Sequence, residues 1–400
     1  MPYNNQVRAQ ASQFQGLNNV RDPRRLKLSW LTTATNVDID DDGYIVRRHG
    51  RTRVHSGTYR NAYAPYDGTY IYLASDTKLY MMGSNEGLEE LSVSLDPSAP
   101  VRFAEVNREV YILNGANHWV GRGSAIREWG QPVPSQPVVT ARPGNAPAGE
   151  YQFAVSYIAP DGRESGLSTR VQAQASDSVQ WRIEVPQHSG YRTAVYMTPA
   201  DDSVLYRIAT TDGLLVDTEA LGIDMSVPAK TEFRYPPPPG SLLEFMRGRM
   251  LVGDYYPEYH MSVIWQSDPL GFEHFQMDHA YIPVPGEIRA MVSGVSGLLI
   301  GTDTQVMLLS PDLQLTTQLD YGVPSGAAAN IDDRGFAFMW TFRGLVVEGG
   351  DEGVQNLMDE AYSPPASHEA SVALLHQGGF RKVVALARES GQPYNAWRKY

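Results

Sequence analysis

An acidic stretch near the start of the chain comes closest to a metal site in the types and spacing of its residues. Asp38, Asp40 and Asp42 fall at the first, third and fifth positions of a calcium-loop pattern, and Gly43 falls at the sixth. Such a loop needs a bidentate glutamate at its twelfth position, but this position is His49, a poor ligand for a hard cation. The pattern therefore lacks the strongest ligand of a calcium loop.

The residues on either side of this acidic stretch favour a hairpin. A calcium loop of this type lies between amphipathic helices, whereas residues 35–39 and 44–46 are short runs rich in β-branched and aromatic residues around an Asp-Gly step. Gly43 can supply the positive φ that a turn needs, and aspartate side chains can accept bonds from nearby backbone amides. We predict two strands joined by an acidic turn, with calcium binding as the alternative.

The histidines and the standard catalytic motifs indicate no second site. If His274 and His279 share one strand, their spacing places them on opposite faces, which disfavours a shared metal ion. The chain has no G-x-S-x-G elbow, P-loop or H-E-x-x-H motif, and it has no cysteine. A carboxylate pair of the glycosidase type cannot be located from sequence. We therefore predict no enzyme activity, no catalytic or metal-binding residues and no cofactor.

The 23 tyrosines include two groups with two interpretations. These groups are Tyr63, Tyr66, Tyr70, Tyr72 and Tyr80, and Tyr255, Tyr256 and Tyr259. Each group could form an aromatic platform for a sugar or a protein. The interpretation we favour is that most of them pack on half-buried strand faces. Tyrosine mixed with arginine and short polar residues is also typical of surfaces where subunits meet.

Composition and spacing predict an all-β fold. The chain has 36 glycines and 27 prolines between short apolar runs, and its 42% hydrophobic content supports a sizeable core. Units of strand, turn and strand recur at a spacing of about 40 residues, as in the four-stranded blades of a β-propeller, without a WD or kelch signature. These units lie at residues 66–82, 101–115, 288–309 and 336–347.

Two proline-rich segments, residues 132–137 and 236–240, mark the predicted domain boundaries. Between them, alternating runs such as 150–157 and 181–185 predict six or seven short strands. This pattern is typical of a fibronectin III-like or immunoglobulin-like β-sandwich, here without a disulfide. The predicted domains are the N-terminal segment and first propeller blades (1–135), an inserted β-sandwich (136–235) and the remaining blades (236–400).

Charge is distributed unevenly along the chain. Of the 33 Lys/Arg and 45 Asp/Glu residues, residues 1–60 hold ten and five, so this segment has a net charge of +5 and the remainder has −17. An acidic body disfavours a groove that grips nucleic acid, but it suits a passage through which DNA slides. The polar start of the chain and the lack of a run of about 18 apolar residues predict a soluble protein made in the cytoplasm, with no membrane partner.

A set of motifs in chain order carries a family resemblance. They are Phe14-x-Gly16, Leu17-Asn18-Asn19, residues 23–28, residues 34–43, Arg47-Arg48, Gly50, Tyr151-x-Phe-Ala-Val-x-Tyr157, residues 161–168 and residues 243–252. In these motifs the chain resembles the tail nozzle proteins of short-tailed bacteriophages, also called packaged-DNA stabilisation proteins. The resemblance spans most of the chain, although each motif is individually loose.

The resemblance implies a structural virion protein located in the tail and made in the host cytoplasm. Its β-propeller subunit would form a homohexameric ring that closes the tail channel, retains packaged DNA and opens for ejection. The implied partners are further copies of the chain, portal and adaptor proteins, tail fibres or spikes, and double-stranded DNA that passes without specific binding. The alternative is a baseplate, tail-fibre-attachment or receptor- or glycan-binding propeller protein of a phage tail.

Overall fold

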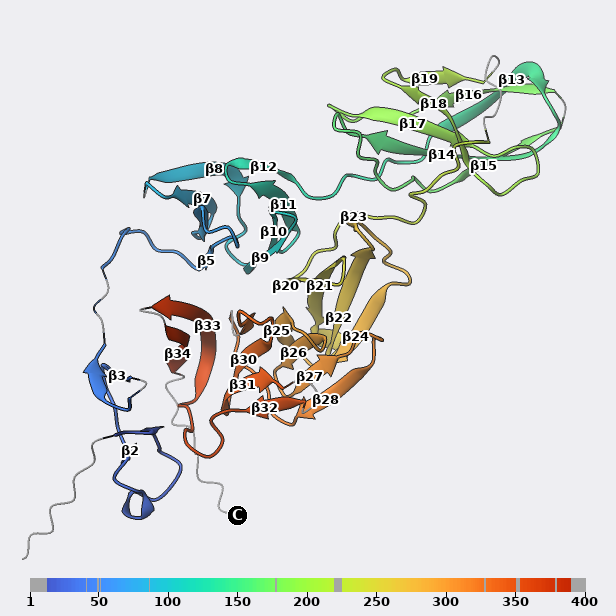
Figure 1. Cartoon of the computed structure of the whole chain (residues 1–400). Coiled ribbons are helices and arrows are strands. Elements are labelled where there is room, and N and C mark those ends of the chain that lie inside the picture. The colour runs from blue at the N-terminus through green and yellow to red at the C-terminus, as the bar shows by residue number, and fades with distance from the viewer. Residues whose placement is uncertain are drawn as a thin grey trace, which may run out of the picture. The chain divides into compact units, whose positions relative to one another are not determined.

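Strands dominate the structure, which is a computed structural model (Figure 1). It describes residues 13–40, 42–48, 50, 52–85, 87–176, 178–218, 225–326, 329–349, 353–377 and 380–389. Within these ranges, the helical elements are two three-residue 3-10 helices, η1 (Pro23–Arg25) and η2 (Pro257–Tyr259). The predicted all-β fold is confirmed. No helix in the described part of the chain is long and apolar enough to cross a membrane.

Contacts divide the chain into two compact units. Unit 1 comprises Met1–Thr58, Pro257–His260 and Pro285–Tyr400, and unit 2 comprises Tyr59–Tyr256 and Met261–Val284. Unit 2 thus holds the residues of the predicted sandwich together with the strands before and after it.

The first two blades in unit 2 are antiparallel four-stranded sheets. Blade one contains β5 (Asn61–Tyr63), β6 (Tyr70–Ala74), β7 (Lys78–Gly83) and β8 (Leu88–Ser94), and blade two contains β9 (Val101–Val106), β10 (Glu109–Asn114), β11 (Asn117–Arg122) and β12 (Ala125–Glu128). Asn107 and Arg108, at φ 53° and 65°, form the two-residue turn between β9 and β10. Positive φ at both positions is the type I′ geometry that matches the twist of paired strands.

The third blade contains β20 (Leu242–Met246), β21 (Arg249–Tyr256), β22 (Met261–Asp268) and β23 (Gly271–Phe275), and β24 (Tyr281–Pro285) also pairs with β22. Arg247 and Gly248, at φ 48° and 77°, form a second turn of the same kind, between β20 and β21. Trp129, Met250 and Phe275 pack in one core that joins blades two and three. Consecutive blades in unit 2 therefore share apolar faces.

Seven strands between blades two and three form the predicted β-sandwich. They are β13 (Val138–Ala146), β14 (Gly149–Ile158), β15 (Val171–Ala175), β16 (Val179–Glu184), β17 (Arg192–Met197), β18 (Tyr206–Thr211) and β19 (Leu215–Asp217). One sheet has the order β13-β16-β19 and the other β15-β14-β17-β18. Trp181 of the first sheet meets Tyr151 and Phe153 of the second at ring-centroid distances of 5.5 and 5.4 Å. Burying a side chain such as Phe153 contributes about 1.5–3 kcal/mol.

Unit 1 contains two further four-stranded blades. Blade four has β25 (Ile288–Ser293), β26 (Leu298–Thr302), β27 (Val306–Leu309) and β28 (Leu315–Leu319), and blade five has β29 (Ala329–Ile331), β30 (Ala337–Thr341), β31 (Gly344–Glu348) and β32 (Val354–Asn356). The first strands of blades one and two begin at residues 61 and 101, and those of blades four and five begin at 288 and 329. Both intervals agree with the predicted repeat, and the propeller-like body is confirmed.

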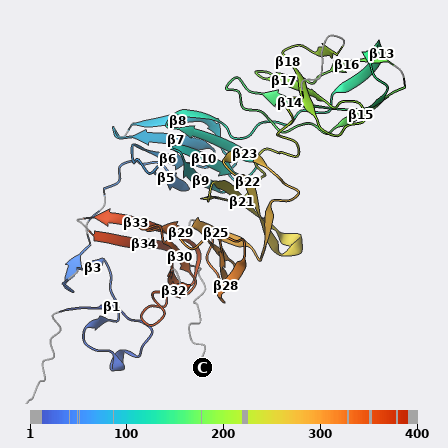
Figure 2. The same ribbon diagram turned by 45° about the vertical axis from the view of Figure 1, so that its right-hand side comes forward.

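Unit 1 also contains both described ends of the chain. We call residues 13–58 the N-terminal arm, which holds β1 (Gly16–Leu17), paired in parallel with β2 (Trp30–Leu31), and the hairpin of β3 (Val37–Ile39) and β4 (Ile45–Arg47). We call β33 (Ser367–Gln377) and β34 (Phe380–Glu389) the C-terminal hairpin (Figure 2). Its buried residues Ala370 and Val372 pack in the core of blades four and five.

Candidate functional site

The acidic stretch forms the predicted hairpin. β3 pairs with β4 in antiparallel register, and Gly43 at the turn has φ 83°. The N–H of Gly43 donates to the carbonyl oxygen of Asp40 at 2.9 Å, and the N–H of Tyr44 donates to the Asp40 carboxylate at 2.7 Å. The Asp40 side chain therefore stabilises the turn, as the sequence indicated.

Asp38 has a different role, since its carboxylate binds two cationic side chains. It lies 3.3 Å from Nε of Arg48 and 3.1 Å from Nζ of Lys382 in the C-terminal hairpin. The hydrogen bond from Lys382 is the main cause that lowers the pKa of Asp38 below its ordinary value. Asp41 and His49 lie outside the described residues. Among those described, no group of three or more His, Cys, Asp or Glu side chains could hold a metal ion.

The two neighbouring histidines do not share a strand. His274 lies in β23, and its Nε2 is 2.8 Å from the carbonyl oxygen of Glu164. His279 lies in the turn after β23, where its N–H donates to the carbonyl oxygen of Gln276. The strand ends at Phe275, so the condition that both histidines share one strand is not met.

Most tyrosines of the first group pack in blade one, as predicted. Tyr70 and Tyr72 are buried in β6, and Tyr63 stacks on Phe103 at a ring-centroid distance of 5.2 Å. The exception is Tyr66, whose side chain is 99% exposed in the turn before β6. In the second group, Tyr259 of η2 is 73% exposed. These two rings are the tyrosines of the two groups best placed to contact a partner.

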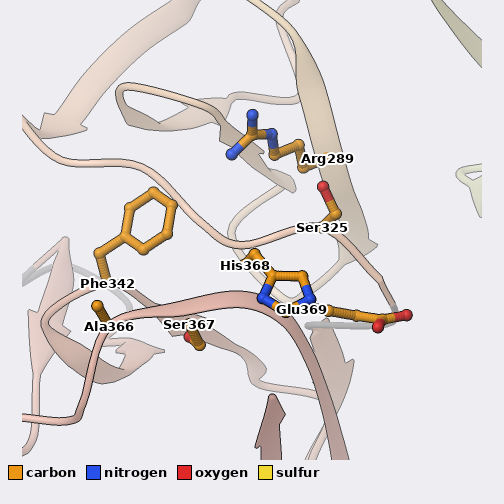
Figure 3. A pocket seen from close by; sticks show the side chains of 7 residues that line it. All are labelled: Arg289, Ser325, Phe342, Ala366, Ser367, His368 and Glu369. Atoms are coloured by element: carbon orange, nitrogen blue, oxygen red, sulfur yellow. The ribbon is translucent and has the colours of Figure 1, made fainter. Parts of the chain in front are cut away.

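A cavity of about 660 Å³ lies in unit 1, where the C-terminal hairpin begins. It is lined by Arg289, Ser325, Phe342, Ala366, Ser367, His368 and Glu369. Figure 3 shows Arg289 and Phe342 facing the same space, while the carboxylate of Glu369 points away from Phe342. The lining comes from four separate segments of the chain, so no local pattern in the sequence indicated it.

Hydrogen bonds fix the walls of this cavity. Nε and Nη2 of Arg289 donate to the Glu287 carboxylate at 3.0 and 2.8 Å, and Nη1 donates to the carbonyl oxygen of Val323 at 3.2 Å. The N–H of Ser325 donates to the carbonyl oxygen of His368 at 3.1 Å. The cavity thus offers an oriented guanidinium, an aromatic face and exposed polar side chains, a composition suited to a polar protein segment.

A network of ion pairs holds the sandwich on blade three. Glu273 of β23 accepts a bond from Nη1 of Arg127 of blade two at 2.7 Å, and it also pairs with Arg163 of the sandwich. Its side chain is only 17% exposed. Trp129 donates from Nε1 to the carbonyl oxygen of Phe272 at 2.8 Å. Residues from blade two and from the sandwich therefore converge on β23.

A second contact secures the return from the sandwich to blade three. Arg234 forms an ion pair with Asp268 of β22. Next to it, Tyr235 and Phe275 exchange backbone hydrogen bonds of 3.0 and 2.9 Å. The proline segment that follows, residues 236–240, predicted a domain boundary here. The sequence did not predict these contacts, because they join residues more than 30 positions apart.

No family model and no curated protein matches this chain. Among solved structures, it is similar to dipeptidyl peptidase 4 of Porphyromonas gingivalis (9% identity, TM-score 0.32, covering 82% of this chain and 51% of that one). It is also similar to PorZ, a surface component of the type IX secretion system of the same organism (11%, TM-score 0.24, 87% and 55%). AztD of Citrobacter koseri is a third match (13%, TM-score 0.27, 76% and 88%).

The chain spans about half the length of the first two of these proteins, 51% and 55%. All three TM-scores lie below 0.5, so these likenesses carry no argument about the function of this chain.

Proposed function

We propose that this protein is a non-catalytic structural component of a phage tail, the nozzle ring that closes the tail channel, retains packaged DNA and opens for ejection. The observation that carries this proposal is the β-sandwich held on blade three through Glu273 and its two arginines. A ring subunit needs rigid β scaffolds with large lateral faces, and a sandwich fixed in this way is such a scaffold.

Three of the motifs that resemble the tail nozzle family lie in the unit that contains this junction. Residues 151–157 lie in β14, and residues 161–168 include Arg163 and Glu164, which contact β23. Residues 243–252 cover the β20–β21 turn of the same blade. These three motifs therefore belong to unit 2, whereas the motifs of residues 14–50 belong to unit 1. Their position beside the held sandwich supports the proposal.

Charge supports the same function. Outside residues 1–60 the chain has a net charge of −17, which repels the phosphate backbone of DNA. We propose a homohexamer in the virion tail, assembled from subunits made in the host cytoplasm. Its partners are portal and adaptor proteins on one side, tail fibres or spikes, and double-stranded DNA that slides through without specific binding.

Electron microscopy of the purified protein, alone and mixed with a portal–adaptor complex from the same phage, tests this proposal. We expect six-fold rings stacked on the adaptor. A matched variant, Glu273→Ala, leaves Arg127 and Arg163 without their shared partner, and we expect it to loosen the sandwich density in the rings. Subunits that remain monomeric and ignore the adaptor would overturn the nozzle assignment.

One observation favours a second candidate, a receptor- or glycan-binding propeller of a phage tail. The ring of Tyr66 is fully solvent-exposed in a blade turn, and aromatic faces of this kind stack on apolar faces of ligands. A glycan screen distinguishes the two. Glycan binding that is lost in Tyr66→Ala and kept in Tyr59→Ala would favour this candidate. If the protein forms rings and binds no glycan, this candidate is excluded.

A further inference from the structure

The N-terminal arm is connected to one compact unit but belongs to the other. It leads directly into blade one, which begins unit 2 at Tyr59, yet the contacts of residues 1–58 place them in unit 1 with residues 285–400. The surface that holds the arm is therefore more than 300 residues further along the chain. Such an arrangement allows the same surface to be provided by another copy of the chain.

The first set of contacts joins the arm to the segment before the C-terminal hairpin. Asn19 and Ser363 bond reciprocally, with Nδ2 of Asn19 donating to the Ser363 carbonyl oxygen at 2.9 Å and the Ser363 N–H donating to Oδ1 of Asn19 at 2.8 Å. The Asn19 N–H donates to the carbonyl oxygen of Ala361 at 3.0 Å. Arg21 pairs with Glu360 at 3.2 Å.

The second set joins the β3–β4 hairpin of the arm to the C-terminal hairpin through the ion pair between Asp38 and Lys382. The two sets lie at two separate places in the arm, residues 19–21 and residue 38. An arm that is held at two places by specific polar contacts has a defined docking position and is not a loose tail.

Charge complementarity supports this docking. The arm, residues 13–58, carries eight Lys/Arg and five Asp/Glu, whereas residues 350–377 carry five Asp/Glu and no Lys/Arg. Opposite charges on the two surfaces speed their encounter and disfavour other orientations. The acidic segment is thus a suitable partner for a basic arm from its own chain or from a second copy.

A linker, residues 48–58, runs from β4 towards blade one. Residues 48–58 contain no strand or helix where the structure describes them. Arg53 folds this linker back by donating to the carbonyl oxygens of His55 and Ser56 at 2.9 and 2.6 Å. Fully extended, eleven residues span about 36 Å.

We propose that in the assembled ring the N-terminal arm of each copy docks on the acidic segment and C-terminal hairpin of the next copy. This inference rests on the proposed ring function. Because the same contacts form in the exchanged and the unexchanged state, the exchange costs little, and a head-to-tail exchange closes a ring. The monomer, in which the arm docks on its own chain, is then the unassembled form.

Cysteine cross-linking tests the exchange, because the natural chain has no cysteine. The single variants Asn19→Cys and Ser363→Cys are produced together as full-length chains, assembled and oxidised. When copies exchange arms at random, about half of the Asn19→Cys chains meet a Ser363→Cys neighbour and form a covalent heterodimer. The double variant should form a ladder of covalent multimers. Asn19→Cys mixed with Ser189→Cys, an exposed residue of the sandwich, is the control and should give no heterodimer.

A short bismaleimide is the second reagent, since it joins thiols whose geometry does not permit a disulfide. Rings whose double variant gives only internally linked monomers would overturn the exchange and leave the nozzle assignment intact. If the protein forms no rings and does not bind the adaptor, the nozzle assignment fails. If the double variant then gives internally linked monomers in the cross-linking experiment, the exchange is overturned as well.

Discussion

Asp38 and Lys382 are 344 positions apart in the chain, yet their side chains form an ion pair of 3.1 Å. The pair connects the β3–β4 hairpin to the C-terminal hairpin within unit 1. The strength of this ion pair decides how firmly the β3–β4 hairpin of the N-terminal arm is held.

Replacing Lys382 with methionine should release the arm more often. A partly exposed ion pair contributes about 0.5–1 kcal/mol, so the rate of tryptic cleavage after Arg53 in the linker should rise about twofold to fivefold. Arg388→Met is the matched control, because its 3.8 Å pair with Glu369 lies within the C-terminal hairpin. Equal cleavage rates in all three proteins would show that the ion pair does not hold the arm.

The same pair predicts a dependence on pH. Lys382 lowers the pKa of Asp38 below its ordinary value of 3.8, so the folded state binds this proton less readily than the unfolded state. The ion pair therefore stabilises the folded state fully above pH 3.8. This stabilisation is lost as the pH falls through the lowered pKa of Asp38. Lys382→Met should therefore differ from the natural protein in linker cleavage at pH 6. This difference should shrink as the pH falls below 3.8, where an acid-active protease provides the measurement.

His118 should make unit 2 less stable in mild acid. Burial lowers the pKa of His118 below its ordinary value of 6.5, and Nε2 lies 2.9 Å from the carbonyl oxygen of Pro238. The unfolded chain then binds a proton at a pH where the folded chain does not, so stability falls as the pH drops below 6.5. Melting temperatures between pH 7.5 and 5.5 should drop less in His118→Gln than in the natural protein. His188→Gln, at an exposed position, should behave as the natural protein does.

Glu348 of β31 should be one of the most sensitive positions in unit 1. Its buried carboxylate accepts bonds from the backbone N–H groups of Ala337, at 3.0 Å, and of Ser296. Glu348→Ala leaves both N–H groups without an acceptor, and we expect a loss of about 2–4 kcal/mol in the free energy of unfolding. Denaturant titration measures this loss. Asp312→Ala, in an exposed turn, should change the unfolding free energy by less than about 0.5 kcal/mol.

Calcium should have little effect on stability. The carboxylates of Asp38 and Asp40 already bind groups of the protein, so we expect chelation or 1 mM calcium to move the melting temperature by no more than about 1 °C, since a bound ion stabilises by mass action. A shift of several degrees that disappears in Asp40→Asn would support the calcium loop instead of the hairpin.

Local patterns in the sequence predicted part of the strands, whereas the strands of blade three and of the C-terminal hairpin were not predicted. The Asp-Gly step at residues 42–43 predicted the β3–β4 hairpin, and strict alternation over residues 150–157 predicted β14. β13 was not identified, because Pro143 interrupts its pattern and most of its residues are exposed. Proline is tolerated at this position, where the register of the ladder shifts between Pro143 and Ala146.

The candidate site could not be predicted in the same way. Its contacts join residues that are distant in the chain, such as Arg163 with Glu273 and Asp38 with Lys382. A charged residue in a strand has the same local pattern whether it faces water or a partner 50 or 300 positions away. Only the packing of one sheet against another decides which charges are paired.

The reciprocal bonds between Tyr235 and Phe275 give the sandwich a mechanical connection to the body. Phe275 is fully buried in the core of blades two and three, so this bridge is fixed on the body side. A force that pulls on the sandwich along the chain loads both bonds together, with the Arg234–Asp268 pair beside them. The force then reaches the blades through β22 and β23, and the proline segment at 236–240 that follows is shielded from it.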